Sequence, residues 1–180
     1  HRMSSAASDV YKRQNLFFSD NAANATIRGV EGDFTYYTNI EGLSVAGAFS
    51  LLNSNIDDKL VPTDDVVVGS ELAFAPGHQG NIRIRKETGM AGGNVGHIQV
   101  QYTFSDKSYS DIMEPNKAKQ DSYSYIDLRA GISNDELTAE LYVDNVTDER
   151  AEISNTFVFD RQRIAYIRPT TIGIRVKKNF

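Results

Sequence analysis

The sequence predicts an all-β fold: an antiparallel up-and-down transmembrane β-barrel, of which about the last seven strands are present. Apolar and polar residues alternate along seven segments, and the connections between those segments are short and long in turn. From the centre of one segment to the next, the chain advances by 14, 36, 16, 28, 13 and 33 residues; the centres are Phe34, Ala48, Ile84, Val100, Leu128, Leu141 and Ile174. An up-and-down barrel with turns at one rim and loops at the other has this rhythm, whereas a Greek-key sandwich does not.

The first predicted hairpin joins residues 25–37 to residues 43–53 through a turn at 39–42. Its first strand places Val30, Phe34 and Tyr36 on one face, opposite Glu31 and Asp33. The turn contains Asn and Gly, which suit a tight reversal of the chain. The second strand alternates in the same way, so one face of this hairpin is apolar.

Two further hairpins follow the same pattern. The second joins residues 81–86 to 95–104 through a glycine-rich turn at 89–94, and the third joins 125–132 to 137–143 through 134–136. Three long connections separate these elements and precede the last strand: 54–79, 105–121 and 145–167.

The last predicted strand begins after Pro169, which lacks the backbone N–H that a strand interior needs. Apolar residues then recur up to the terminal aromatic ring; they are Ile172, Ile174, Val176 and Phe180. The segment resembles the C-terminal assembly signal of outer-membrane barrels, although Lys178 departs from that pattern. We therefore interpret this strand as lipid-facing and as the barrel-assembly signal.

The composition and the residue pattern exclude several classes of function. Acidic, basic and amide side chains occupy the second face of the predicted strands, which suits a water-filled lumen better than a packed core. The chain has no cysteine, which excludes disulfides and cysteine-bound metals, and its net charge of −5 argues against a nucleic-acid partner. The sequence contains no nucleophile–histidine–acid set and no metal-binding or cofactor motif, so we expect no enzyme activity, metal or cofactor.

Residues 1–14 form a separate stretch in this interpretation. They lack the apolar core of a signal peptide and resemble translated sequencing-adapter sequence. We expect an artefactual leader at 1–14, followed by the barrel portion at 15–180 of a gene that continues upstream.

Three stretches resemble TonB-dependent receptors, the active transporters of the Gram-negative outer membrane. Residues 27–31 match a Gly-Val-Glu strand late in these barrels, residues 141–150 match an Asn-Leu-Thr-Asp segment near their end, and residues 168–180 match their closing strand. The order and spacing of the three stretches make the resemblance specific, and it covers nearly all of residues 15–180.

The resemblance implies the C-terminal part of a 22-stranded barrel in the bacterial outer membrane. It implies a receptor that imports an iron–siderophore complex or another scarce nutrient. The expected partners are outer-membrane lipid, the barrel assembly machinery, a small-molecule ligand, and the TonB complex through an N-terminal region missing from this sequence. Two alternatives stay open: a small outer-membrane barrel, or a secreted β-sandwich binding module without transport activity.

Five lumen-facing side chains are candidates for ligand contact: Glu31, Arg83, Arg85, Gln99 and Arg129. Arg83 and Arg85 suit an anionic ligand, because a guanidinium group binds carboxylates with paired hydrogen bonds. The alternative is that both arginines pair across the barrel wall with Glu31, Asp127 or Glu140.

Overall fold

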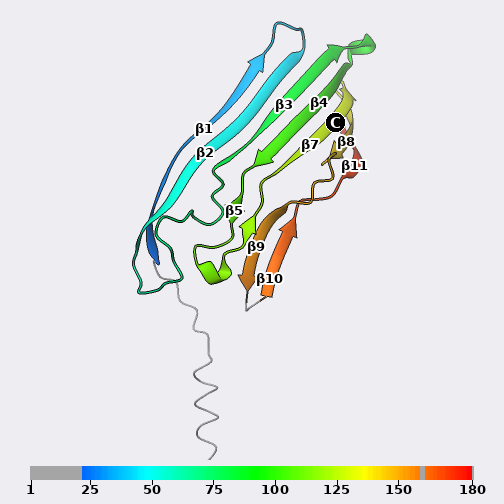
Figure 1. Ribbon diagram of the computed structural model, residues 1–180. Coiled ribbons are helices and arrows are strands. Elements are labelled where there is room, and N and C mark those ends of the chain that lie inside the picture. The colour runs from blue at the N-terminus through cyan, green and yellow to red at the C-terminus, as the bar shows by residue number, and fades with distance from the viewer. Residues whose placement is uncertain (1–21, 159–160, 180) are drawn as a thin grey trace, which may run out of the picture.

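The computed structural model describes residues 22–158 and 161–179; the predicted leader and Phe180 lie outside them. The chain forms one antiparallel seven-stranded sheet in the order β1-β2-β3-β4-β7-β8-β11, with β1 and β11 at its edges (Figure 1). Its strands are β1 (Ala23–Tyr37), β2 (Leu43–Lys59), β3 (His78–Gly89), β4 (Val95–Ser105), β7 (Tyr123–Ser133), β8 (Leu137–Asp144) and β11 (Thr171–Lys178). The all-β, up-and-down arrangement predicted from the sequence is confirmed.

The predicted strands all form, and several are longer than predicted. The largest difference is in β2, which continues to Lys59 instead of residue 53 because its backbone remains paired with the start of β1, up to Ala23. Residues 53–59 are mostly polar on both faces, so alternation could not reveal this extension. The first long connection therefore begins six residues later than predicted.

The long connections contain structure that the alternation did not predict. Two small hairpins lie beyond one end of the sheet (Figure 1): β5 (Ser108–Tyr109) pairs with β6 (Lys119–Gln120), and β9 (Glu152–Val158) pairs with β10 (Arg161–Tyr166). Single 3-10 turns occur at Ala91–Gly93 (η1) and Glu114–Asn116 (η2). We call the end of the sheet that carries the long connections the loop rim, and the opposite end the turn rim.

The strand register gathers the apolar residues onto one continuous face. One row across the sheet pairs Tyr36 with Val45, Val45 with Ile84 and Ile84 with Val100, and it continues through Leu128, Val143 and Ile172. These side chains are largely exposed, and Ile174 in the next row is 75% exposed. We call this surface the apolar face. No second sheet packs on it among the described residues, so the β-sandwich alternative is wrong.

Hydrophobic burial is confined to the loop rim. The buried apolar residues of the described chain are Ile56, Val66 and Ala151, from the end of β2 and from two long connections. Val66 forms a β-bridge with Met113, and the backbone N–H of Phe74 donates to the Tyr109 carbonyl at 2.8 Å. The first two long connections therefore pack on each other as an ordered unit. No helix in residues 22–158 and 161–179 is long and apolar enough to cross a membrane.

Five glycines lie directly opposite an aromatic side chain on the neighbouring strand. A Cβ added at any of them would come within 3.2 Å of the facing ring, so the ring occupies the space that the glycine leaves empty. The pairs are Gly32–Phe49, Gly47–Phe34, Gly80–Phe104, Gly131–His97 and Gly173–Tyr142. The first three lie on the apolar face and the last two on the opposite face.

Candidate functional site

The face opposite the apolar face carries the charged and amide side chains, and we call it the polar face. It contains all five candidate residues from the sequence. Three of them form one row, because Arg85 on β3 lies opposite Gln99 on β4, and Gln99 lies opposite Arg129 on β7. Arg83 occupies the next row toward the loop rim, and Glu31 on β1 lies farther along, opposite Ser50. The structure thus brings Arg85, Gln99 and Arg129 together and separates Glu31 from them.

Arg85 is held by neighbours on the polar face. Its Nε lies 2.8 Å from Oε1 of Glu87, and its Nη1 donates to Oε1 of Gln99 at 3.3 Å. The predicted pairing with Glu31, Asp127 or Glu140 is therefore wrong for Arg85, since Glu87 lies two residues away on the same strand and so on the same face. Its charge is partly neutralised before any ligand binds.

Arg83 has a different environment. Within residues 22–158 and 161–179 it makes no hydrogen bond or ion pair, and its side chain is exposed. The expected acidic partners are engaged elsewhere: Glu31 accepts a hydrogen bond from Oγ of Ser50 at 3.1 Å, and Asp127 accepts one from the backbone N–H of Asn145 at 2.8 Å. Arg83 remains available to an anionic group.

A four-residue ionic cluster lies near the turn rim of the polar face. The Glu140 carboxylate, whose side chain is 11% exposed, lies within 3.2 Å of His97 Nε2, 3.3 Å of Arg175 Nη1 and 3.6 Å of Arg129 Nη1. The four residues of the cluster come from four different strands, so the cluster connects β4, β7, β8 and β11. The sequence did not predict this cluster, because residue spacing does not give the register between neighbouring strands.

Gly131 makes the contact between His97 and Glu140 possible, although these residues lie two strands apart. It lies on β7 between His97 and Glu140, directly opposite each of them. A Cβ there would lie 2.6 Å from Cε1 of His97, so any larger residue would push the imidazole away. The imidazole reaches across the empty position to the carboxylate two strands away.

Tyr142 closes the same region at the edge of the sheet. Its ring covers Gly173 on β11, and the guanidinium carbons of Arg129 and Arg175 lie 5.7 and 5.6 Å from the ring centroid. Guanidinium groups at this distance from an aromatic face are attracted to its negative potential. The charged side chains in this part of the polar face thus contact one another across the strands rather than forming an open ligand site.

An open hollow of about 580 Å³ occupies the loop-rim half of the polar face. Its polar lining includes Glu31, Asp33, Ser50, Gln79, Asn81 and Thr103. Glu31 is the only one of the five candidate residues in this lining. The two acidic side chains lining the hollow have no cationic partner within the described residues. This hollow is therefore acidic, whereas the candidate arginines predicted a basic site for an anionic ligand.

The start of the third long connection is held by Asn145, which is 2% exposed and adopts a left-handed φ of 52°. Its Nδ2 donates to the carbonyls of Glu149 and Arg168, at 3.0 and 2.8 Å, and its own carbonyl accepts from Oγ1 of Thr170 at 2.8 Å. Asp148 adds a second link, since its Oδ1 accepts from the Thr170 backbone N–H at 3.1 Å. We call these three residues, Asn145, Asp148 and Thr170, the loop clamp.

Asp148 and Lys107, both in long connections, have shifted pKa values. The Thr170 backbone N–H, together with the Arg150 guanidinium, lowers the pKa of Asp148 below its usual value. A hydrogen bond from the Lys107 ammonium to Glu71, at 3.0 Å, raises the pKa of Lys107. Both shifts favour the charged forms that hold the connections in place.

The residues of the predicted assembly signal lie on the last strand, β11, as far as the structure describes it. Ile172, Ile174 and Val176 lie on the apolar face and are exposed, while Phe180 is outside the described residues. No group of three or more potential metal ligands occurs within residues 22–158 and 161–179.

A family model described as "TonB dependent receptor-like, beta-barrel" matches residues 4–146. This chain belongs to the TonB-dependent receptors. The match covers most of the chain, and it begins inside the stretch 1–14, whose separate origin stays a prediction. Among curated proteins, no sequence matches the chain.

Solved structures of receptors share the fold. The ferric yersiniabactin uptake receptor FyuA from Yersinia pestis has a TM-score of 0.72 and 18% sequence identity, over 89% of this chain and 24% of that receptor. The ferric citrate transporter FecA in its unliganded form has a TM-score of 0.66 and 14% identity, over 85% of this chain and 24% of FecA. The siderophore receptor PiuA from Acinetobacter baumannii has a TM-score of 0.60 and 14% identity, over 84% of this chain and 21% of PiuA.

The chain therefore spans about a quarter of the length of these receptors. TonB-dependent receptors are outer-membrane transporters and not enzymes, and in general they engage TonB and a small-molecule ligand. The resemblance drawn from the sequence motifs is confirmed at the level of the family.

Proposed function

We propose that this chain forms part of the outer-membrane barrel wall of a receptor that imports a small scarce nutrient, such as an iron–siderophore complex, with energy delivered through TonB. The observation that carries the proposal is the polarity of the sheet. Apolar side chains on the outside are exposed, while charged and amide side chains line the opposite face. A barrel in water favours apolar side chains inside and polar side chains outside. A barrel in lipid with a water-filled lumen favours apolar side chains outside and polar side chains inside.

The proposed orientation follows from the lengths of the connections. Outer-membrane barrels have short periplasmic turns and longer extracellular loops. The turn rim, with its connections at 38–42, 90–94 and 134–136, then faces the periplasm. The packed unit at the loop rim faces outward and meets the ligand first, and the open hollow of the polar face lies directly below it.

The proposed partners follow from the two faces. Outer-membrane lipid contacts the apolar face, and the barrel assembly machinery binds the last strand through Ile172, Ile174, Val176 and Phe180. The ligand contacts the polar face, where Arg83, Arg85, Glu31, Gln99 and Arg129 remain the candidate residues. The TonB complex is a further proposed partner, as it is in general for TonB-dependent receptors.

Membrane assembly is tested in a chimaera. Residues 15–180 are joined to the upstream part of a related receptor, with and without Phe180, and expressed in a Gram-negative host. We expect a heat-modifiable barrel in the outer-membrane fraction, and a sharp decrease in its amount when Phe180 is deleted. Recovery of residues 15–180 alone as a monomeric β-protein in detergent-free buffer would contradict the proposal.

Transport is tested separately, with the receptor that the natural gene encodes. Cells with and without TonB are given radiolabelled iron as a panel of siderophore complexes. We expect uptake of at least one complex only in cells that contain TonB. Accumulation at equal rates in both strains would exclude TonB-dependent import.

A further inference from the structure

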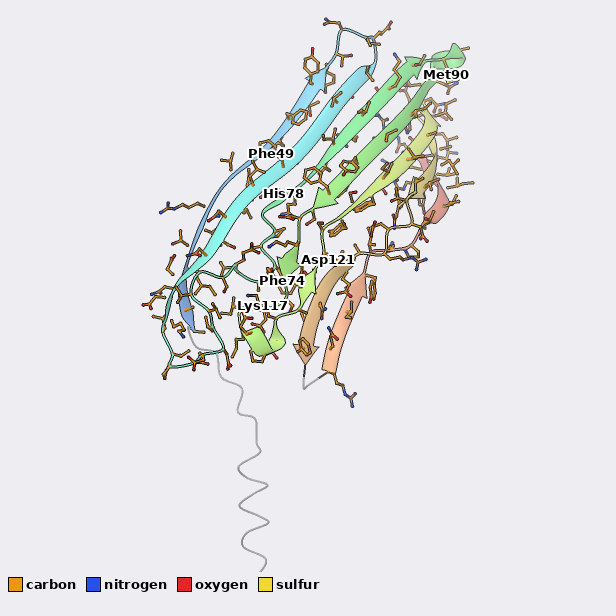
Figure 2. The ribbon with its side chains drawn as sticks, in the orientation of Figure 1. Phe49, Phe74, His78, Met90, Lys117 and Asp121 are labelled. Atoms are coloured by element: carbon orange, nitrogen blue, oxygen red, sulfur yellow. The ribbon has the colours of Figure 1, made fainter. Side chains whose placement is uncertain are left out.

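A second, smaller hollow of about 140 Å³ lies at the loop rim, next to the hollow of the polar face. The two share Gln79, Ser105 and Tyr123, which places them side by side on the ends of β3, β4 and β7. Figure 2 shows Phe74 and Asp121, which line the second hollow, in the loop region beyond the wall residue Phe49, which lines the first. Together they form a path from the loops onto the polar face, which we call the entry path.

Among the described residues, the entry path is lined by carboxylates and by no cationic side chain. Glu31 and Asp33 line the part on the polar face, and Asp106, Asp121 and Glu152 line the part under the loops. The predicted ligand-binding arginines Arg83, Arg85 and Arg129 are absent from both linings. Clustered charge of one sign in a concave surface concentrates ligands of the opposite sign.

Three of these carboxylates lack a cationic partner. Asp106 is 3.4 Å from Nδ1 of His78, and Asp121 is 2.6 Å from Nζ of Lys119. The other three, Glu31, Asp33 and Glu152, make no ion pair within the described residues, although Glu152 accepts a hydrogen bond from Nδ2 of Asn155 at 3.1 Å. The entry path therefore has uncompensated negative charge.

Each hollow also contains a buried polar atom without a partner. Gln120 lines the smaller hollow and is 4% exposed; its Oε1 accepts from Oγ of Ser108 at 2.6 Å, but its Nε2 has no acceptor in the described chain. Thr103 lines the larger hollow, and its Oγ1 likewise has no partner there. Leaving such groups unpaired costs free energy, which a bound polar ligand recovers.

We infer that the entry path accepts a cationic ligand, one that carries an ammonium or amidinium group together with hydrogen-bonding oxygens. The cationic group is attracted by Glu31, Asp33 and Glu152, and the oxygens accept from groups such as Gln120. This inference rests on the proposed function and narrows its ligand class. It reverses the anionic ligand that Arg83 and Arg85 suggested, because the structure separates those arginines from the path.

The test uses three ferric trihydroxamate complexes with one scaffold: one with a free ammonium group, its neutral N-acetyl form and its anionic N-succinyl form. Binding to the receptor encoded by the natural gene is measured in detergent by isothermal titration. We expect the ammonium form to bind at least about tenfold more tightly than the succinyl form, which corresponds to ~1.4 kcal/mol. The difference decreases at high ionic strength because salt screens the carboxylates.

The double variant Glu31→Gln with Asp33→Asn tests the residues directly, and we expect it to remove most of the preference for the ammonium form. Glu136→Gln is the matched control, since Glu136 lies in the turn at 134–136 and its carboxylate makes no hydrogen bond or ion pair within the described residues. Heat-modifiable gel mobility checks that each variant folds. The comparison of the three complexes on the wild-type receptor remains a test even if a variant does not fold.

The outcomes separate the two levels of the proposal. Equal affinities, or tighter binding of the succinyl form, would overturn the inference of a cationic ligand. TonB-dependent uptake of any complex would still support the proposed receptor function. Loss of TonB-dependent uptake for every siderophore tested would contradict the proposed function itself. A preference for the ammonium form that survives in the double variant would overturn the assignment to Glu31 and Asp33.

Discussion

Single residues in this chain act mainly across strands. Gly131 illustrates this, because its missing side chain lets His97 reach Glu140, two strands away. The sequence predicted which face each of these residues occupies, since a period of two determines it. It could not predict the contact, because the pairing of β4, β7 and β8 is set by long-range register.

We expect Gly131→Ala to destabilise the folded barrel. The new Cβ would lie 2.6 Å from the His97 ring and 2.7 Å from the Ala139 carbonyl, so either the imidazole or the backbone must move. Overpacking of this kind costs about 1–3 kcal/mol. The measurement is the urea midpoint of heat-modifiable mobility. Gly89→Ala is the control, since a Cβ there meets nothing within 4 Å, and equal midpoints for the two variants would contradict the expected effect.

The Asp148 carboxylate gives the loop clamp a dependence on pH. Because its folded pKa is below the ordinary 3.8, its contribution to stability is present above that value and is lost as the pH falls through the folded pKa. We expect hydrogen exchange in residues 166–172, corrected for its intrinsic pH dependence, to stay constant from pH 7 to 5 and to accelerate below about 4. Asp148→Asn should remove the acceleration; an unchanged profile would exclude this carboxylate as its cause.

At the level of elements, the alternation of apolar and polar residues was enough to predict the seven strands of the sheet. Each long strand has one apolar and one polar face, so its pattern is readable from sequence. The two small hairpins were missed for a physical reason: β5–β6 has two-residue strands, and β10 is exposed on both faces. Two-residue strands are too short to show alternation, and β10 has the same exposure on both faces; β9 buries the polar Asn155, so its apolar residues do not mark a buried face.

The loop clamp likewise could not be predicted, since Asn145 and Thr170 lie 25 residues apart in the sequence. We expect Asn145→Ala to loosen the third long connection, because the change leaves the Glu149 and Arg168 carbonyls without this donor and places alanine at a left-handed φ. The cost is about 1–3 kcal/mol. Limited proteolysis of membrane-inserted receptor should cut residues 145–170 faster.

The control for that experiment is Asn179→Ala, which removes an exposed hydrogen bond to the Asp135 carbonyl at the turn rim. It should leave the cleavage rate of residues 145–170 unchanged. Equal cleavage rates in wild type and Asn145→Ala would show that the clamp does not hold the connection.

At the level of the whole molecule, the seven strands combine into a wall that is apolar on its exposed side. This property followed from the sequence, because the same period of two runs through every strand and the register keeps it aligned. The uneven distribution of charge on the polar face did not follow, since it depends on which side chains become neighbours. The ionic cluster near the turn rim and the acidic hollow near the loop rim can be recognised only in the assembled sheet.

We expect Ile174→Lys to impair barrel stability strongly. In water, substitution of a residue that is 75% exposed changes stability by about 0.5 kcal/mol or less, but a lysine facing the lipid midplane costs about 2–4 kcal/mol. The readout is the urea midpoint in lipid vesicles. Thr35→Lys, at an exposed position on the polar face, is the matched control; equal effects would contradict a lipid-facing surface.

The loop clamp has a consequence for how such receptors diversify. It joins the two ends of the third connection at the level of the wall, so the hairpin β9–β10 is anchored independently of its own sequence. Residues 152–166 are then an exchangeable module, in which insertions, deletions and transplanted hairpins leave the barrel intact. New ligand preferences could evolve, or be engineered, by grafting at this position without redesigning the membrane-embedded strands.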